Sequence, residues 1–262
     1  MTAAAAHLLR QRSVGELVFT MGNSGGKSGP KILRESGASK IRIPYGSTQA
    51  ITINTGGGLA GGDRFDLSFG CEAGATLCLT TQAAERVYQT LGPPAEISTQ
   101  MNVEKNAQLF WLPQETILYN GASLARTYTI KLAATAKFLG IEPVVFGRTA
   151  MGEKINSIHL QDSWRIWRDD KLLHAEELKI GPDLPSSKAT LDGAQAMATM
   201  IYVANDAEIK LEAIREFSAA SAWNGKLIAR FIAKDSYALR KALIPAIKAL
   251  AGSEVLPKIW TA

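Results

Sequence analysis

Short segments in which apolar and polar side chains alternate recur along the first two thirds of the chain. An alternation with a period of two places every apolar side chain on one face, which is typical of a β-strand with one buried face. The segments recur about every ten to twelve residues with turn-prone clusters between them, and this spacing predicts a mainly β body. The clearest segments are residues 41–43, 51–53, 65–69, 101–103, 128–132 and 155–160.

The pattern changes past Pro185. Residues 197–203 and 227–232 are strand candidates, and apolar residues recur at helical spacing after each of them, over 209–217 and over 239–250. The last quarter of the chain therefore predicts a strand-helix-strand-helix unit. The apolar stripes of the two helices either join the core or form a surface on which a partner docks.

We expect three parts in the chain. Residues 1–16 form a flexible tail, residues 17–185 form the β-strand body, and residues 186–262 form a small α/β portion that shares the core of the body. The first residues have neither a basic leader nor a long apolar core, so they do not resemble a signal peptide. There is no run of about eighteen apolar residues, so we expect a cytoplasmic protein without a membrane span.

Five of the seven residues at 56–62 are glycines, and this loop joins two predicted strands. Gly56, Gly58 and Gly61 match the spacing of a dinucleotide-binding fingerprint, which needs a helix directly after the loop to bind the pyrophosphate. The alternation at 65–69 predicts a strand there instead. The glycines therefore indicate a chain reversal that needs positive φ angles or close backbone packing. A nucleotide-dependent enzyme that uses this loop is kept as an alternative.

A second glycine-rich segment, residues 22–28, nearly matches a phosphate-binding P-loop. Met21 stands where the motif requires its first glycine, and Gly29-Pro30 interrupts the helix that should follow. We interpret the segment as a flexible loop after a short strand at 17–19.

The charge is mild and evenly spread. The formal net charge is +5 over 262 residues, with 46% hydrophobic and 20% charged residues, and the basic residues form no tract longer than the pair Arg240-Lys241. This composition is typical of a soluble globular protein and predicts no nucleic-acid-binding stripe. A basic surface still favours an acidic protein partner.

Signals for catalysis or tight metal binding are weak. The chain has three histidines, His7, His159 and His174, and none lies at a short helical spacing from another. Cys71 and Cys78 are seven residues apart, which favours two reduced, partly buried thiols over a disulfide. There is no G-x-S-x-G elbow and no histidine beside either cysteine. We therefore expect no catalytic residues and no tightly bound cofactor.

Carboxylates and arginines stand out at three places, namely Asp63-Arg64 after the glycine loop, Glu115, and Arg148 with Glu153. Two interpretations remain open. These residues form buried ion pairs or turn hydrogen bonds that fix the corners of the strands. Alternatively, some of them line a polar passage that holds a divalent ion weakly and passes it on.

Four motifs follow one another in the chain, at 57–64, 79–88, 112–117 and 146–153. Their sequences, GGLAGGDR, LTTQAAERVY, LPQETI and FGRTAMGE, and their order resemble the signature of the urease accessory protein UreD family, also called UreH. The resemblance extends over roughly residues 17–177.

The resemblance implies a scaffold without catalytic activity, built as a helical winding of β-strands similar to a β-helix, with a small C-terminal α/β portion. It implies that the chain binds apo-urease, docks the accessory protein UreF and through it recruits the GTPase UreG, as a chaperone for nickel incorporation. It also implies an internal tunnel for transient Ni²⁺. A generic β interaction module for some other protein stays an alternative.

The residues that this picture brings forward fall into three groups. The candidate tunnel-lining carboxylates are Asp63, Glu115 and Glu153. Their candidate counterions are Arg64, Arg86 and Arg148. The glycines of the structural motif are Gly57, Gly58, Gly61 and Gly62.

Overall fold

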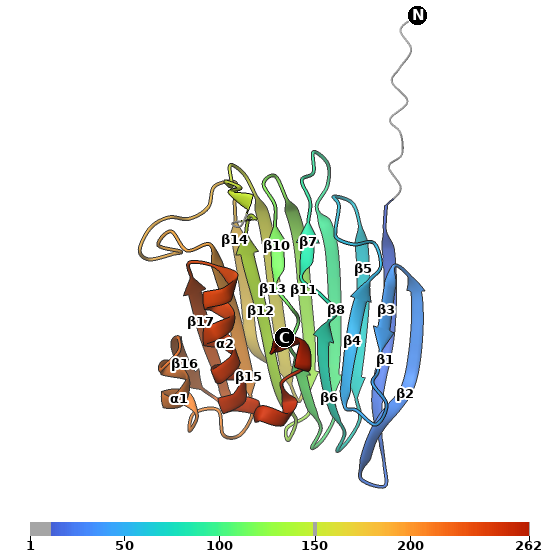
Figure 1. Cartoon of the computed structure of the whole chain (residues 1–262). Coiled ribbons are helices and arrows are strands. Elements are labelled where there is room, and N and C mark those ends of the chain that lie inside the picture. Colours follow the sequence, from blue (N-terminus) through green and yellow to red (C-terminus); the bar gives the residue numbers. More distant parts are fainter. Residues whose placement is uncertain (1–11, 149–150, 262) are drawn as a thin grey trace, which may run out of the picture.

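Two β-sheets lie face to face, and the chain passes from one to the other and back (Figure 1). The computed structural model describes residues 12–148 and 151–261. Sheet A consists of β14 (Lys171–Ile180), β13 (His159–Arg168), β11 (Ser123–Leu132), β8 (Ala95–Val103), β5 (Arg64–Cys71), β1 (Val14–Ser24) and β2 (Lys27–Gly37), in that order. Sheet B consists of β16 (Ala219–Trp223), β17 (Lys226–Ala233), β15 (Ala196–Val203), β12 (Lys137–Phe146), β9 (Gln108–Trp111), β6 (Thr76–Thr81), β4 (Gln49–Asn54) and β3 (Ser39–Arg42), with β7 (Glu85–Val87) and β10 (Thr116–Leu118) beside them.

Parallel strands form the centre of each sheet. In sheet A the parallel strands are β1, β5, β8, β11 and β13, and in sheet B they are β4, β6, β9 and β12. A strand of one sheet separates successive strands of the other in the sequence, so the chain winds as a β-solenoid of about four turns. The predicted mainly β, helically wound fold is confirmed.

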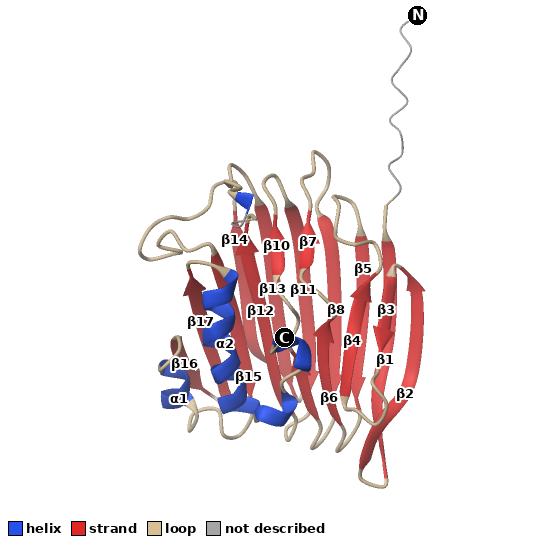
Figure 2. Cartoon of the chain, in the orientation of Figure 1, coloured by secondary structure: helices blue, strands red, loops and turns tan. Residues whose placement is uncertain are grey.

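Antiparallel strands cover the ends of the winding. β2 pairs with β1 and β3 with β4 at one end, whereas β14 pairs with β13 and β15 with β12 at the other. β17 and β16 then extend sheet B, and both α-helices lie on the side of this extension (Figure 2). The helices are α1 (Leu211–Arg215) and α2 (Ser236–Ala251), followed by the short 3-10 helices η2 (Ser253–Val255) and η3 (Lys258–Trp260).

The glycine loop is a crossing between the sheets. It leaves β4 of sheet B and enters β5 of sheet A at Arg64, so a strand follows it, as the alternation predicted. Gly58 has a φ of +148°, and a Cβ there would lie 2.5 Å from Cε2 of Tyr88. Gly61 lacks a positive φ, but a Cβ at this position would collide with Thr90. Positive φ and close packing therefore both explain the glycines.

The second glycine-rich segment, residues 22–28, is not the flexible loop that we predicted from its sequence. β1 continues to Ser24 and β2 begins at Lys27, and the two residues pair across a tight turn. Gly25 and Gly26 form the turn with φ angles of +58° and +81°, which explains the glycines without a phosphate.

The C-terminal portion largely follows its pattern. β15, β17 and α2 lie where they were predicted, and the side chain of Asp235 caps α2 by accepting a hydrogen bond from the Ala238 amide at 2.7 Å. The first helix is shorter than predicted, and β16 was missed. β15 pairs with β12 along its length, so sheet B is continuous from the body into this portion. The predicted tail, residues 1–16, overlaps β1, which begins at Val14. Residues 1–11 lie outside the described residues.

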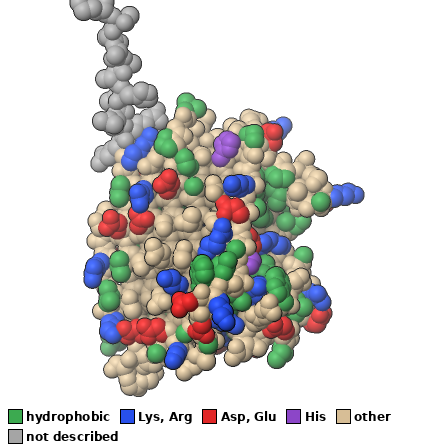
Figure 3. Space-filling model, turned by 180° about the vertical axis from the view of Figure 1, so that it is seen from behind, with side chains coloured by type: hydrophobic (Ala, Val, Ile, Leu, Met, Phe, Trp, Pro, Cys, Tyr) green, Lys and Arg blue, Asp and Glu red, His purple; other side chains and the backbone are tan. Residues whose placement is uncertain are grey.

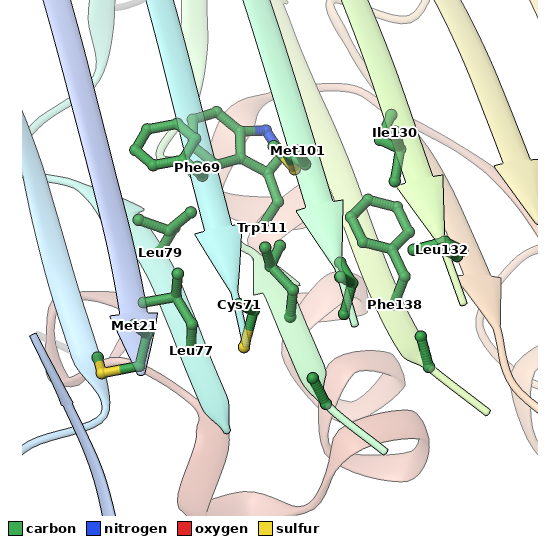
Figure 4. Close-up of a cluster of buried hydrophobic side chains, with 14 of the residues drawn as sticks. Met21, Phe69, Cys71, Leu77, Leu79, Met101, Trp111, Ile130, Leu132 and Phe138 are labelled. Atoms are coloured by element: carbon green, nitrogen blue, oxygen red, sulfur yellow. The ribbon is translucent and has the colours of Figure 1, made fainter. Parts of the chain in front are cut away.

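The buried apolar side chains form three clusters. One lies between the sheets, where Phe69, Met101 and Ile130 of sheet A face Trp111 and Phe138 of sheet B (Figure 4). A second cluster between the sheets contains Leu59, Phe65, Leu124 and Phe146 among others. The third fills the space between the outer face of sheet B and α2.

Both cysteines are free and buried, and burial raises the pKa of each thiol to about 12, so they are inert packing residues. Among the described residues, no helix has the length and hydrophobicity needed to cross a membrane.

Candidate functional site

A cavity of about 350 Å³ lies between the two sheets. Its walls include parts of three of the four motifs, at 57–59, at 81–86 and at 113, 114 and 116. Each of these segments follows a strand of sheet B, namely β4, β6 or β9. Because these strands are parallel and adjacent, their carboxyl ends meet at one edge of the sheet, and the three motifs lie side by side.

A buried charged cluster forms one wall of the cavity. Arg126 on β11 and Asp162 on β13 occupy paired positions in sheet A, and Nη2 of Arg126 lies 2.6 Å from Oδ2 of Asp162. Glu142 comes from β12 of sheet B and accepts hydrogen bonds from Nη1 of Arg126 and from the hydroxyl of Tyr128. Arg126, Glu142 and Asp162 are each at most 4% exposed. The cluster therefore joins the two sheets across their interior.

The cluster holds one cation for two carboxylates. Burial raises the pKa of Glu142, and Arg126 opposes this rise. For Arg126, burial lowers the pKa, but Asp162 and Glu142 outweigh burial and the pKa is raised. The arginine therefore stays charged, and the second carboxylate either holds a proton or attracts a further cation.

A second carboxylate faces the cavity at the glycine loop. Glu85, in the second motif, accepts hydrogen bonds at 3.2 Å from Nδ2 of Asn54, which also donates to the carbonyl of Gly58 at 3.2 Å. Burial raises the pKa of Glu85 to about 7, against the hydrogen bond from Asn54. Glu85 therefore changes its charge near neutral pH.

The cavity wall also offers polar atoms that have no partner among the described residues. These atoms are the Thr99 hydroxyl and Nε2 of Gln114, and both side chains are buried. Buried polar groups without a hydrogen bond are costly. A cavity of this volume has room for several water molecules, so the atoms have space in which to bind water or a hydrated ion.

The polar layer continues beyond the cavity to the opposite edge of the solenoid. In sheet B, Glu142 lies beside Thr199, and Thr199 lies beside Arg230. Nη1 of Arg230 donates to the Thr199 hydroxyl at 3.1 Å, and Arg230 pairs with Glu176 of sheet A. His174 is 3.4 Å from the same carboxylate. The two apolar clusters between the sheets are thus separated by a polar layer.

The three carboxylates singled out in the sequence lie away from this cavity. Asp63 accepts hydrogen bonds from the amides of Ser13 at 2.8 Å and Ala60 at 2.7 Å, so it fixes the corner of the glycine loop. Glu115 turns to the outer side of sheet B, where it pairs at 3.0 Å with Arg240 of α2.

The remaining predicted residues form surface contacts at the corners. Glu153 pairs with Arg148 at 3.0 Å, and the Arg148 guanidinium lies 4.4 Å from the ring centre of Tyr119. Arg64 pairs with Asp66 at 3.0 Å instead of with Asp63. Arg86 is the one predicted arginine that lines the cavity. Thr149 and Ala150 of the fourth motif lie outside the described residues.

The buried cluster has a signal in the sequence that lies outside the four motifs. Arg126 stands in phase with Leu124, Tyr128 and Ile130 on the buried face of β11, and Asp162 stands in phase with Leu160 and Trp164 on β13. A charged residue on the apolar phase of a strand must be paired inside the protein. In the described parts of the chain, no group of three histidines, cysteines or acidic residues is arranged to hold a metal ion.

The fold defines the class of the molecule as a β-solenoid protein with an internal polar layer. The model of the family described as UreD urease accessory protein matches residues 13–261, and the chain belongs to this family. It is 41% identical over 271 residues to urease accessory protein UreD of Rhizobium johnstonii, with 99% of both chains covered. It is 40% identical over 269 residues to the protein of the same name from Mesorhizobium japonicum, with 97% of this chain and 95% of the relative covered.

The match confirms the resemblance seen in the four motifs. UreD is a family of non-catalytic accessory proteins of urease maturation, so the nucleotide-dependent enzyme is no longer a competing interpretation. The strand that directly follows the glycine loop agrees with this result.

Proposed function

We propose that the chain is a scaffold for nickel incorporation into apo-urease, in a complex with UreF and the GTPase UreG, and that nickel crosses it through the polar layer between the sheets. The observation that carries this proposal is the cavity itself. Three of the four family motifs border it, and it leads into a charged cluster that apolar packing alone does not require.

The chemistry of the polar layer suits a cargo that must be released again. Glu85 and Glu142 face the cavity together with hydroxyl, amide and carbonyl groups. Oxygen ligands of this kind bind Ni²⁺ weakly, whereas clustered thiolates and imidazoles would retain it. In this proposal Glu85 and Glu142 take the transport role, and Asp63, Glu115 and Glu153 keep the corner contacts described above.

The test replaces Glu142 by Gln and compares it with Glu115→Gln. Glutamine at 142 keeps one oxygen that accepts from Arg126, and its amide group can donate to the Tyr128 hydroxyl, but it loses the charge. Glutamine at 115 removes a charge on the outer side of the same sheet. Each variant is co-expressed with urease and the other accessory proteins. We expect Glu142→Gln to lower the nickel content and activity of urease by about tenfold or more, and Glu115→Gln to leave both near the wild-type values.

Thermal melting of each purified variant separates transport from folding. Equal urease activation by a folded Glu142→Gln variant and by the wild type would refute the passage. The scaffold role has its own test, because a folded wild-type chain that captures neither UreF nor UreG at micromolar concentration contradicts it.

A further inference from the structure

Helix α2 turns its apolar stripe inward. Leu239, Leu243 and Ile247 are buried against the outer face of sheet B. The apolar stripe that the sequence offered as a docking surface is therefore part of the core. Any partner that meets α2 meets its outward face, which lies uncovered on the surface in Figures 1 and 2.

The outward side of α2 carries lysines at a spacing of seven residues. Lys234 just precedes the helix, and Lys241 and Lys248 lie within it; all three are exposed. Seven residues are close to two helical turns, so Lys241 and Lys248 lie on one line along the helix, about 10 Å apart, and Lys234 stands just before the start of the helix. We call Lys234, Lys241 and Lys248 the basic ridge. Tyr237, which is 76% exposed, lies one turn before Lys241.

The charges of the basic ridge are not compensated within the described structure. None of its lysines takes part in an ion pair among the described residues. Two nearby carboxylates have other partners, because Asp235 caps the helix and Glu115 pairs with Arg240. The ridge therefore presents positive charge to the solvent.

The opposite face of the molecule differs. There, basic and acidic side chains are interspersed (Figure 3). On strands of sheet A, Arg64 pairs with Asp66 at 3.0 Å and Arg165 with Glu177 at 3.6 Å. The feature that sets α2 apart is that its unpaired lysines share the outward side of one element.

We propose that the basic ridge of α2 docks an acidic segment of a protein partner in urease maturation. The inference rests on the proposed scaffold function. Complementary charge gives such a contact its orientation and its association rate, and Tyr237 adds the kind of aromatic side chain that often anchors an interface. The partner is expected to present carboxylates at matching intervals along a helix or an extended strand.

The experiment compares Lys241→Glu/Lys248→Glu with Lys131→Glu/Lys171→Glu. The control changes the net charge equally, at two exposed lysines of sheet A that form no ion pair among the described residues. Tagged full-length chains are co-expressed with urease, UreF and UreG, and the captured proteins are quantified at low and at high salt. We expect the α2 variant to capture at least about tenfold less of one partner, and the amount captured to depend much less on salt than for the wild type. The control should capture the wild-type amount with the wild-type salt dependence.

Two further measurements keep the inference falsifiable. Glutamate in the last helical turn opposes the helix dipole, so Lys241→Gln/Lys248→Gln is included and should give a loss between the wild type and the charge reversal. Unchanged capture by both folded variants overturns the docking surface but leaves the scaffold intact, whereas a wild type that captures nothing overturns the scaffold. Wild-type binding to vesicles with anionic lipid, abolished in the α2 variant without loss of protein capture, would assign the ridge to a membrane surface instead.

Discussion

The two faces of sheet B are built from the same strands but have opposite chemistry. On the outer face, Leu139, Ile141 and Val145 of β12 pack against the apolar side of α2 in a continuous hydrophobic cluster. On the inner face, Phe138 and Phe146 belong to two separate apolar clusters, and Glu142 lies between them. Strand β12 thus contributes apolar side chains to the core on its outer side and a buried carboxylate on its inner side.

The difference shows which part of the molecule is optimised for stability. Burial of apolar side chains under α2 stabilises the folded state with no charge to desolvate. A buried ion cluster often contributes no more than well-packed apolar residues would, because the charges must be desolvated. An interior polar layer that divides the core is therefore better explained by the proposed passage than by folding. Three changes would break or sharpen this contrast.

The largest effect is expected from Arg126→Met. The change leaves Glu142 and Asp162 buried without their cation, and removing one member of a buried ion cluster costs about 3–5 kcal/mol. Urea unfolding measures the loss. Adding Glu142→Gln and Asp162→Asn to Arg126→Met should recover part of it, since no uncompensated charge then remains. A loss below about 1 kcal/mol in the single variant would mean that the carboxylates are protonated or solvated.

The second effect belongs to the apolar side of the sheet. Leu243→Ala removes a buried side chain of α2 and should lower the free energy of unfolding by about 2–4 kcal/mol through lost burial and a new cavity. Leu172→Ala, at a half-exposed position, is the control and should change it little. Urease activation per folded molecule should stay near the wild-type value for Leu243→Ala, in contrast to a change in the polar layer.

Much of the fold could be predicted from the sequence because its signals are local. The alternation of apolar residues located β5 and parts of β8 and β11 in sheet A, and the apolar spacing from Leu239 to Leu250 located α2. The pairing of strands was not predictable in this way, since the parallel stacking of β5 on β8 joins residues that are about thirty positions apart. The winding of the strands came from the family resemblance alone.

The candidate site could not be predicted from the sequence either, because its contacts also join residues that are far apart in the chain. Glu115 and Arg240 are separated by 125 positions, and Glu142 meets Arg126 only because the two sheets face each other. The motifs suggested Asp63 and Glu153 as tunnel residues, yet Asp63 accepts a hydrogen bond from the Ala60 amide and Glu153 pairs with Arg148, both at corners of the chain. The useful signal was weaker, namely a charge that falls on the apolar phase of a strand.

The smallest effect, and the one with a distinctive pH dependence, is expected from Glu85→Gln. The pKa of Glu85 in the folded chain is about 7, above its ordinary value of 4.5, so between these values the folded state binds more protons than the unfolded state. Stability must therefore fall as the pH rises through this window, by about 1–2 kcal/mol after an allowance for solvent screening. Glu85→Gln should remove the part of the fall that Glu85 causes and be more stable than the wild type at pH 8, while the contribution of Glu142, whose pKa burial also raises, stays in both proteins.

Urea midpoints between pH 4.5 and pH 8 measure this slope. The same measurement extended below pH 4.5 on Glu153→Gln supplies the opposite case on the surface. Arg148 lowers the pKa of Glu153 through a hydrogen bond, so the contribution of Glu153 is present above its ordinary pKa and is lost as the pH falls below it. The two variants should therefore change the pH profile in different windows and with opposite signs. If Glu85→Gln keeps the wild-type slope, then Glu85 is solvated, and the cavity is open to bulk water at the glycine loop.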